Sequence, residues 1–244
     1  MPFLSYGLSN MRPFSTKRTR FIDAVKKIPG LVAYYPMSET TGTSVRNYAT
    51  STIGGLVGTT TGATINNTGL IGRSISFDGS NDRVAVSNNA NLDAVTGTWF
   101  FMIKLNANKS GNGNTIMARN DPGSSASGIN IKLDTNNVVG VQMKSGVTDR
   151  LSFNSLTQLT TTAWYLVAFT FTNNGECIFY INGTASNSGT MSGTFAFNGQ
   201  SLLFGENIDS FWADFNGLIQ HGGVISRVLT PGEIGKLAHI AGFI

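Results

Sequence analysis

The stretch WYLVAFTFTNNGECIFYING, residues 164–183, reads as two β-strands joined by a tight turn at residues 172–175. Successive side chains of a strand point to opposite faces. One face of the first strand carries Tyr165, Val167, Phe169 and Phe171, and the other carries Trp164, Leu166, Ala168 and Thr170. Both faces are largely apolar, whereas a hairpin on a protein surface has one face in water. The second face therefore needs a cover, and the cover bears on function.

The rest of the chain has the composition of many short strands joined by turns. It has 244 residues, of which 41% are hydrophobic, 12% are charged and 29 are Gly. Turn sequences such as DGSND (78–82), SGNGN (110–114) and TNNG (172–175) separate the apolar runs. Besides the hairpin, the candidate strands are 31–36, 74–77, 83–86, 98–105, 115–120, 129–133, 137–144, 150–153, 201–205 and 215–229. Short strands without intervening helices predict an antiparallel sandwich or barrel.

The first 30 residues differ from the body in charge. They hold six basic residues and one acidic residue, whereas the whole chain has a net charge of +4, so the body is nearly neutral. We therefore expect no nucleic-acid binding by the body. Residues 1–18 read as an extended arm. A short helix is expected over 19–28, with Phe21, Ile22 and Val25 on one side and Pro29 ending it.

The other end of the chain carries a clear helix signal. Thr230, Pro231 and Glu233 form a capping box with proline at the first helical position. No run of about 18 apolar residues occurs, so we expect no membrane span. The N-terminus lacks the roughly 7–15-residue apolar stretch of a signal peptide, so we expect no secretion signal.

Four stretches, in order along the chain, resemble the laminin G type of the concanavalin A-like lectin/glucanase superfamily. They are GLVAYYPMSETTGTSVRNYA (30–49), SISFDGSNDRVAV (74–86), WYLVAFTFTNNGECIFYING (164–183) and FNGLIQHGGVISRVLTPGEIGKLA (215–238). The resemblance implies an all-β, antiparallel jelly-roll sandwich over residues 30–244, with residues 1–29 as a separate arm and helix. The face with Tyr165 and Phe169 would lie in the core. The face with Trp164 would lie under loops or under a docked partner.

Catalysis is not expected. Glycosidases of this broad fold resemble one another in a Glu-x-Asp-x-x-Glu strand, which aligns carboxylates for acid and nucleophile roles. No such spacing occurs here. The densest acidic cluster is Glu206, Asp209 and Asp214, and in a strand these intervals would alternate between faces. The alternative is that these acids solvate a turn before Phe215.

Two ligand classes remain open. The turn at 78–82 offers Asp78 and Asp82, and oxygen-rich turns suit calcium. Relatives are similar in an acid after the FNGLI motif, where this chain has Gln220, which counts against the ion. The alternative is an Asx-turn. For sugars, the best candidates are Phe211 and Trp212 as stacking rings and Asn207 and Asp209 as hydroxyl partners; alternatively, the rings cap one end of the sandwich.

These features predict a non-enzymatic structural protein of a virion surface, such as a phage decoration, head-fibre or tail-associated protein, and a homo-oligomer. The arm would attach it to other virion proteins, because apolar and basic side chains there lie outside any evident fold. The expected docking residues are Phe3, Tyr6, Phe14, Lys17, Arg18, Arg20, Phe21, Ile22 and Val25. No cofactor other than calcium is considered. The alternative is a soluble carbohydrate-binding module, and a glycosidase is more remote.

Overall fold

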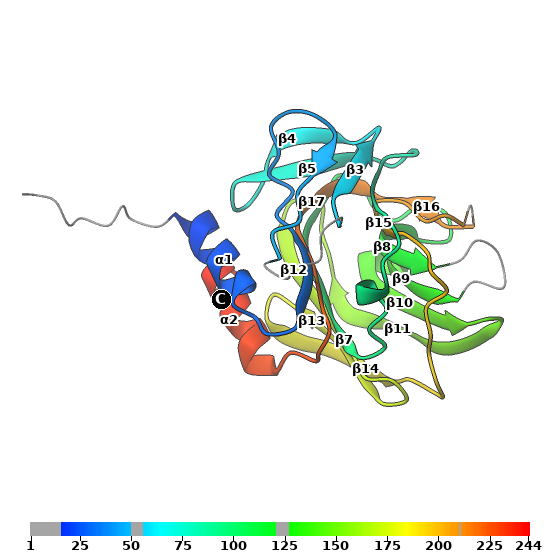
Figure 1. The fold of residues 1–244 in the computed structure, drawn as a ribbon. Coiled ribbons are helices and arrows are strands. Elements are labelled where there is room, and N and C mark those ends of the chain that lie inside the picture. The colour runs from blue at the N-terminus through cyan, green and yellow to red at the C-terminus, as the bar shows by residue number, and fades with distance from the viewer. Residues whose placement is uncertain (1–15, 50–55, 121–126, 210) are drawn as a thin grey trace, which may run out of the picture.

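The computed structural model describes residues 16–49, 56–120, 127–209 and 211–244. They form two stacked, largely antiparallel β-sheets with two helices on one outer side (Figure 1). Sheet A runs in the order β14-β13-β12-β7-β17-β5-β4, with β1 paired to β17. Its strands are β1 (Leu31–Tyr35), β4 (Thr64–Thr68), β5 (Arg73–Asp78), β7 (Gly97–Leu105), β12 (Trp164–Phe171), β13 (Glu176–Ile181), β14 (Thr184–Thr190) and β17 (Asn216–Ile225). The strand that opened the sequence argument, β12, lies between β7 and β13 in this sheet.

Sheet B runs in the order β11-β10-β9-β8-β15-β6-β3-β2, with the short β16 paired in parallel to β8. Its strands are β2 (Ser44–Val45), β3 (Gly58–Thr61), β6 (Arg83–Val86), β8 (Asn114–Asn120), β9 (Gly128–Leu133), β10 (Val138–Ser145), β11 (Thr148–Gln158), β15 (Leu202–Phe204) and β16 (Ala213–Asp214). Two 3₁₀ turns, η1 (Ala90–Leu92) and η2 (Thr135–Asn137), lie in the connections. The predicted all-β sandwich is therefore confirmed.

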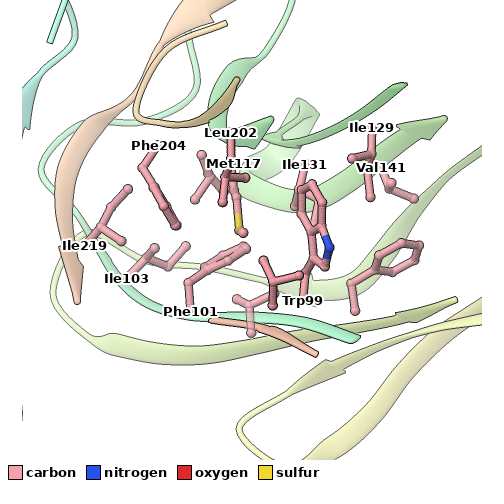
Figure 2. Close-up of a cluster of buried hydrophobic side chains, with 14 of the residues drawn as sticks. Trp99, Phe101, Ile103, Met117, Ile129, Ile131, Val141, Leu202, Phe204 and Ile219 are labelled. Carbon is pink, nitrogen blue, oxygen red and sulfur yellow. The ribbon is translucent and has the colours of Figure 1, made fainter. Parts of the chain in front are cut away.

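The core between the sheets is built by alternating apolar side chains, as the period-2 pattern predicts. Val167, Phe169 and Phe171 of β12 point into it, and Phe169 and Phe179 lie 4.9 Å apart between ring centres. Figure 2 shows the middle of this inter-sheet core, where Trp99 and Phe101 of sheet A face Ile131 of sheet B. The tight turn after β12 is also present, because the Gly175 amide donates to the carbonyl of Thr172 at 3.0 Å.

The second apolar face of β12 is covered by helices, which answers the opening question. Leu166 and Ala168 are buried beneath α1 (Lys17–Lys26) and α2 (Pro231–Ala241), which pack against each other. We call this second cluster the helix-side core. Its buried members are Phe21, Ile22, Val25, Leu31, Tyr34, Ile71, Phe100, Met102, Leu166, Ala168, Tyr180, Ile225, Leu229, Ile234, Leu237, Ala238 and Ala241. The cover is thus the chain's own two-helix layer, where loops or a partner were expected.

Both helices start at threonine caps. In α1 the Thr16 hydroxyl accepts the amide of Thr19 at 3.1 Å, so the helix starts before the predicted residue 19. In α2 Thr230 and Glu233 complete the predicted capping box. Within the described residues, neither helix is long and apolar enough to cross a membrane.

A glycine turn fits the hairpin β13–β14 against α2. Asn182 and Gly183 both have positive φ, at 52° and 89°, the backbone that a tight two-residue hairpin turn requires. A Cβ at Gly183 would lie 2.6 Å from the Cβ of Ala238 in α2, closer than carbon atoms can pack. The Asn-Gly pair that ends the opening stretch therefore sets both the turn and the approach of the helix layer.

The sequence prediction missed the most polar strands. The strands β3, β4 and β14 consist mainly of Thr, Ser, Asn and Gly, so they lack the apolar alternation that reveals a strand. They lie at or near sheet edges, and their side chains are exposed or half-buried at most positions of β4 and β14. Pairing with stronger neighbours, rather than intrinsic propensity, makes them strands.

Candidate functional site

The loop between β15 and β17 stands at one end of the sandwich and is fixed at both ends. The Gly205 amide donates to a β8 carbonyl at 3.0 Å, and the Phe215 amide donates to the Gly205 carbonyl at 2.8 Å. The Asn114 side chain donates to the Asp214 carbonyl at 2.7 Å, and Phe215 is fully buried. A loop held in this way presents its middle residues on a rigid base, which suits ligand recognition.

The four predicted sugar-binding residues lie together in this loop. Asn207 accepts the amide of Asp209 at 2.9 Å, and Asp209 accepts the amide of Phe211 at 3.0 Å. The ring of Phe211 is 58% exposed and meets Trp212 edge-on at 4.9 Å. Trp212 is half-buried, with the Lys132 ammonium 4.3 Å from the centre of its ring. Trp212 thus behaves as a cap on the sandwich, whereas Phe211 is the ring open to a ligand.

Three hollows surround this loop, with volumes of about 270, 360 and 380 Å³. Gly79 and Asp214 line both the first and the third, and Glu206 and Ile208 line both the second and the third. Ligand sites span roughly 300–1,000 Å³, so the first hollow is slightly below this range and the other two are at its small end. Because they share walls, together they offer a recess around the loop that is larger than any one of them.

One residue that lines the largest of the three hollows, Asn207, carries an unpaired amide group. The side chain of Asn207 is 5% exposed and lines the 380 Å³ hollow. Its oxygen is used by Asp209, but its Nδ2 group has no hydrogen-bond partner. A buried donor without a partner costs about 1–3 kcal/mol, so such a group points to a ligand that would satisfy it.

The turn between β5 and β6 brings further carboxylates to the same end. The Asp82 carboxylate accepts the amide of Asp78 at 2.8 Å, and the Asp78 carboxylate accepts the amide of Ser80 at 2.8 Å. The Asp214 carboxylate, from the loop, accepts the amide of Asn81 at 2.7 Å. This is the Asx-turn arrangement, in which aspartates hold the backbone of their own turn.

The crowding of acids changes the protonation of Asp214. Burial raises its pKa, and the negative charges of Glu206, Asp82 and Asp78 raise it further, against the lowering effect of the hydrogen bond from Asn81. Burial also raises the pKa of Asp82. The Asp214 carboxyl group therefore holds its proton to a higher pH than a free aspartate does, first because it is buried and then because other acids are near it.

The residues present do not fit a calcium ion well. The carboxylates of Asp78 and Asp82 each hold a backbone amide of their turn, and among the described residues they are not gathered with a third ligand of the kind that a metal site needs. Gln220 lies elsewhere, buried with its amide 3.3 Å from the sulfur of Met102 on the helix side. Over the described ranges, no group of three or more His, Cys, Asp or Glu side chains has the arrangement of a metal site.

The acidic cluster lies in the loop between β15 and β17. Glu206 and Asp214 lie in a loop and its short terminal strand, and both line the 380 Å³ hollow. The strand alternation considered for this cluster does not apply to Glu206, which lies in a loop, as in the alternative that these acids belong to the segment before Phe215. Glu206 is held by Arg83 at 2.9 Å. The absence of catalysis stays a prediction.

The predicted docking residues divide into three groups. Phe3, Tyr6 and Phe14 lie outside the described residues. Lys17 and Arg20 are exposed on α1, and Arg18 is half-buried, donating to the Ser38 hydroxyl at 2.7 Å.

The third group, Phe21, Ile22 and Val25, corrects the prediction. Their exposed fractions are 0%, 8% and 0%, because they pack into the helix-side core. They hold α1 onto sheet A and cannot also meet a partner, so the proposed boundary at residue 29 does not separate α1 from the sandwich.

The sequence analysis missed the outer face of sheet B. In β9, Ile129, Ile131 and Leu133 point into the core, so Asn130 and Lys132 point outward. The strict alternation of apolar and polar residues in INIKL (129–133) indicates that one face of this strand is polar. It could not show which sheet lacks the helices, because the order of the strands cannot be deduced from the sequence.

Two stacked sheets with a fixed aromatic loop and polar hollows at one end define a lectin-like β-sandwich. A family model for the concanavalin A-like lectin/glucanases superfamily matches residues 78–235, which is more than half of the chain. The chain belongs to this superfamily, in its laminin G type. No curated protein sequence matches the chain.

Solved structures of similar fold come from larger proteins. They include the Trypanosoma rangeli sialidase in complex with sialic acid (TM-score 0.65, 11% identity, covering 90% of this chain and 36% of that one). The binding domain of Paraclostridial Mosquitocidal Protein 1 matches with a TM-score of 0.64 and 15% identity, covering 89% of this chain and 52% of that one. The binding domain of botulinum neurotoxin DC in complex with SialylT matches with a TM-score of 0.62 and 14% identity, covering 87% of this chain and 52% of that one. The chain thus spans about a third to a half of these chains, and the likeness shows the fold alone.

Proposed function

We propose that this chain is a non-enzymatic virion structural protein, of the decoration, head-fibre or tail-associated kind, whose β-sandwich binds glycans on the host surface. The observation that carries the glycan half is the exposed ring of Phe211, on a loop fixed at both ends, beside a hollow walled by the unpaired amide of Asn207. An aromatic face and convergent polar groups are what a sugar needs, since its CH face is apolar and its rim consists of hydroxyls.

Two of the structural relatives support a glycan as the ligand. The T. rangeli sialidase was solved in complex with sialic acid, and the botulinum neurotoxin DC binding domain was solved in complex with SialylT. In this chain the hydroxyl partners would be the Asn207 amide and the Asp78 and Asp214 carboxylates, which line the hollows near the ring. Asp209 would act indirectly, because its carboxylate positions the backbone of Phe211.

The glycan half is tested by replacing the exposed ring. Phe211→Ala should lower binding on a glycan array and in calorimetry about tenfold or more, because stacking on a ring contributes roughly 1–3 kcal/mol in comparable sites. Leu156→Ala is the matched control, since Leu156 is 76% exposed on β11 and far from the hollows in sequence and strand order. Equal binding by the Phe211 variant and the control would count against the site.

The attachment half rests on charge. Lys17, Arg20 and Lys26 are exposed on α1, Lys27 is exposed at its C-cap, and Lys236 is exposed on α2. Asp23 is the one exposed acid of α1, so the basic residues outnumber it. None of these basic residues takes part in the ion pairs found among the described residues. The two-helix layer is therefore a basic surface on the side opposite the candidate site. An acidic protein surface of a particle would attract it, and added salt would weaken the attraction.

The attachment test must leave α1 in place, because Phe21 and Val25 are fully buried. Deletion of residues 1–15 keeps the Thr16 cap, and a second variant carries Lys26→Glu and Lys27→Glu on the exposed side. Both should fold, and both should bind weakly to particles that lack the protein. Full occupancy by the two variants would contradict attachment through this side.

A soluble carbohydrate-binding module is the alternative, and it predicts glycan binding with no attachment to any particle. A glycosidase is favoured only by the shared hollow of Glu206 and Asp214. Release of free sugar from bound glycans, abolished by Glu206→Gln or Asp214→Asn, would establish the enzyme and overturn the non-enzymatic proposal.

A further inference from the structure

The walls of the three hollows have an unbalanced charge. Among the described residues that line them, the acids are Asp78, Glu206 and Asp214, and Arg83 is the single cation. Arg83 is already paired with Glu206 at 2.9 Å. No lining side chain is therefore left to neutralise a negative group on a ligand.

Two further lysines lie beside the hollows. Lys109 falls between the lining residues Asn108 and Ser110 without lining a hollow itself, and Lys132 is engaged by other groups. Lys132 forms an ion pair with Asp134 at 2.6 Å, while its ammonium lies over the ring of Trp212. Both contacts hold its charge on the sandwich side of the loop. Two more acids flank the hollows, namely Asp82 in the turn and Asp209 in the loop, which increases the negative charge around the recess.

The hydrogen-bonding groups indicate what the recess does accept. The buried Asn207 Nδ2 is a donor without a partner and needs an acceptor oxygen. The carboxylates of Asp78 and Asp214 each accept one backbone amide, and carboxylate oxygens have lone pairs for several more donors. A sugar hydroxyl can accept from the amide and donate to a carboxylate at once, and an ammonium group can donate to the carboxylates.

From this charge and donor pattern, and resting on the proposed glycan function, we infer that the site takes uncharged or amine-bearing sugars and rejects sugars that carry a carboxylate, such as sialic acid. A ligand carboxylate would lie near like charges, with no unpaired cation among the side chains that line the hollows to offset the repulsion. A carboxylate also has no hydrogen to donate to Asp78 or Asp214. The raised pKa of Asp214, caused first by burial and then by the neighbouring acids, is consistent with the negative potential of this recess.

The experiment uses the whole chain and pairs of glycans that differ only in sialic acid, such as lactose and 3′-sialyllactose, on an array and then in calorimetry. The sialylated member should bind about tenfold more weakly or worse. Raising the salt concentration should bring the affinities for the two glycans closer together. An Asp78→Asn, Asp214→Asn double variant should reduce the difference in affinity further, because both side chains keep an acceptor for their backbone amides while losing charge. Asp149→Asn is the matched control, since Asp149 lies on β11 away from the hollows.

The outcomes separate this inference from the function on which it rests. Preferential binding of the sialylated member that depends on Phe211 would overturn the inference and leave glycan binding standing. Binding of neither class by the wild-type chain, with Phe211→Ala indistinguishable from it, would overturn both. A preference for the uncharged member that the double variant fails to reduce would show that shape, not charge, excludes sialic acid, and would also overturn the inference.

Discussion

The two outer faces of the sandwich differ in every respect that matters for function. The outer face of sheet A is apolar and lies beneath α1 and α2, whose exposed side is basic. Over the described residues, the outer face of sheet B carries polar side chains such as Asn130 and Gln142, and no α-helix lies over it (Figure 1). A strand with two apolar faces thus marks the helix-covered sheet, and a strand with one polar face marks the sheet without α-helices.

The largest expected effect comes from breaking the covered face. Phe21→Ala removes a fully buried ring that lies 4.8 Å from His221, and should lower the free energy of unfolding by about 3–5 kcal/mol. Phe211→Ala, at the exposed ring near sheet B, should change it by less than about 0.5 kcal/mol. Urea denaturation of both variants measures the difference. Similar losses in the two would show that α1 does not stabilise the sandwich.

The same residues show how much of the fold and of the candidate site could be predicted from the sequence. The alternation in residues 164–171 predicts both clusters of β12, and the capping box at Thr230 predicts α2. The nature of the cover was not predictable, because Phe21 and Leu166 are distant in sequence and no local rule pairs them. At the candidate site, Asn207 and Phe211 were predicted from residue type alone, and their role in binding stays a prediction. The hollow between Glu206 and Asp214 was not predictable, because it arises only when β16 pairs with β8.

The second effect is a pH dependence of stability that arises on the helix-covered face, at His221. His221 is buried under α1; its Nδ1 accepts from the Tyr34 hydroxyl at 2.6 Å, and its Nε2 lies 3.4 Å from the Ile71 carbonyl. Burial lowers the pKa of His221 from 6.5 to about 3, and the nearby Arg18 charge also lowers it, whereas the contact with Ile71 raises it. Tyr48 is the other titratable group close to Tyr34 in this cluster.

The sign of the pH effect follows from which state binds the proton. Unfolding exposes His221 and lets it protonate below pH 6.5, so the stabilisation is complete above that pH and is lost progressively toward pH 3. This residue alone should lower the free energy of unfolding by about 2 kcal/mol between pH 7.5 and pH 5. His221→Asn should remove that slope, because Asn tolerates the positive φ of 55° found here and does not titrate. An unchanged slope in this variant would assign the pH dependence to other groups.

The smallest effect concerns a buried polar side chain on the outer side of sheet B. Asn130 is 3% exposed, and neither its amide oxygen nor its amide nitrogen has a hydrogen-bond partner, although both atoms are buried. Asn130→Val should therefore stabilise the chain by about 1 kcal/mol, since an unpaired buried amide is unfavourable and Val suits a strand. Gln142 is the matched control, because it faces Asn130 across the β9–β10 pair but donates to Asp149 at 3.1 Å. Gln142→Val should give no gain in urea denaturation. A lower free energy of unfolding in the Asn130 variant would mean that the polar side chains of sheet B stabilise the fold, as the helix-side core does. The outer faces of the two sheets would then differ in charge and polarity but not in their contribution to stability.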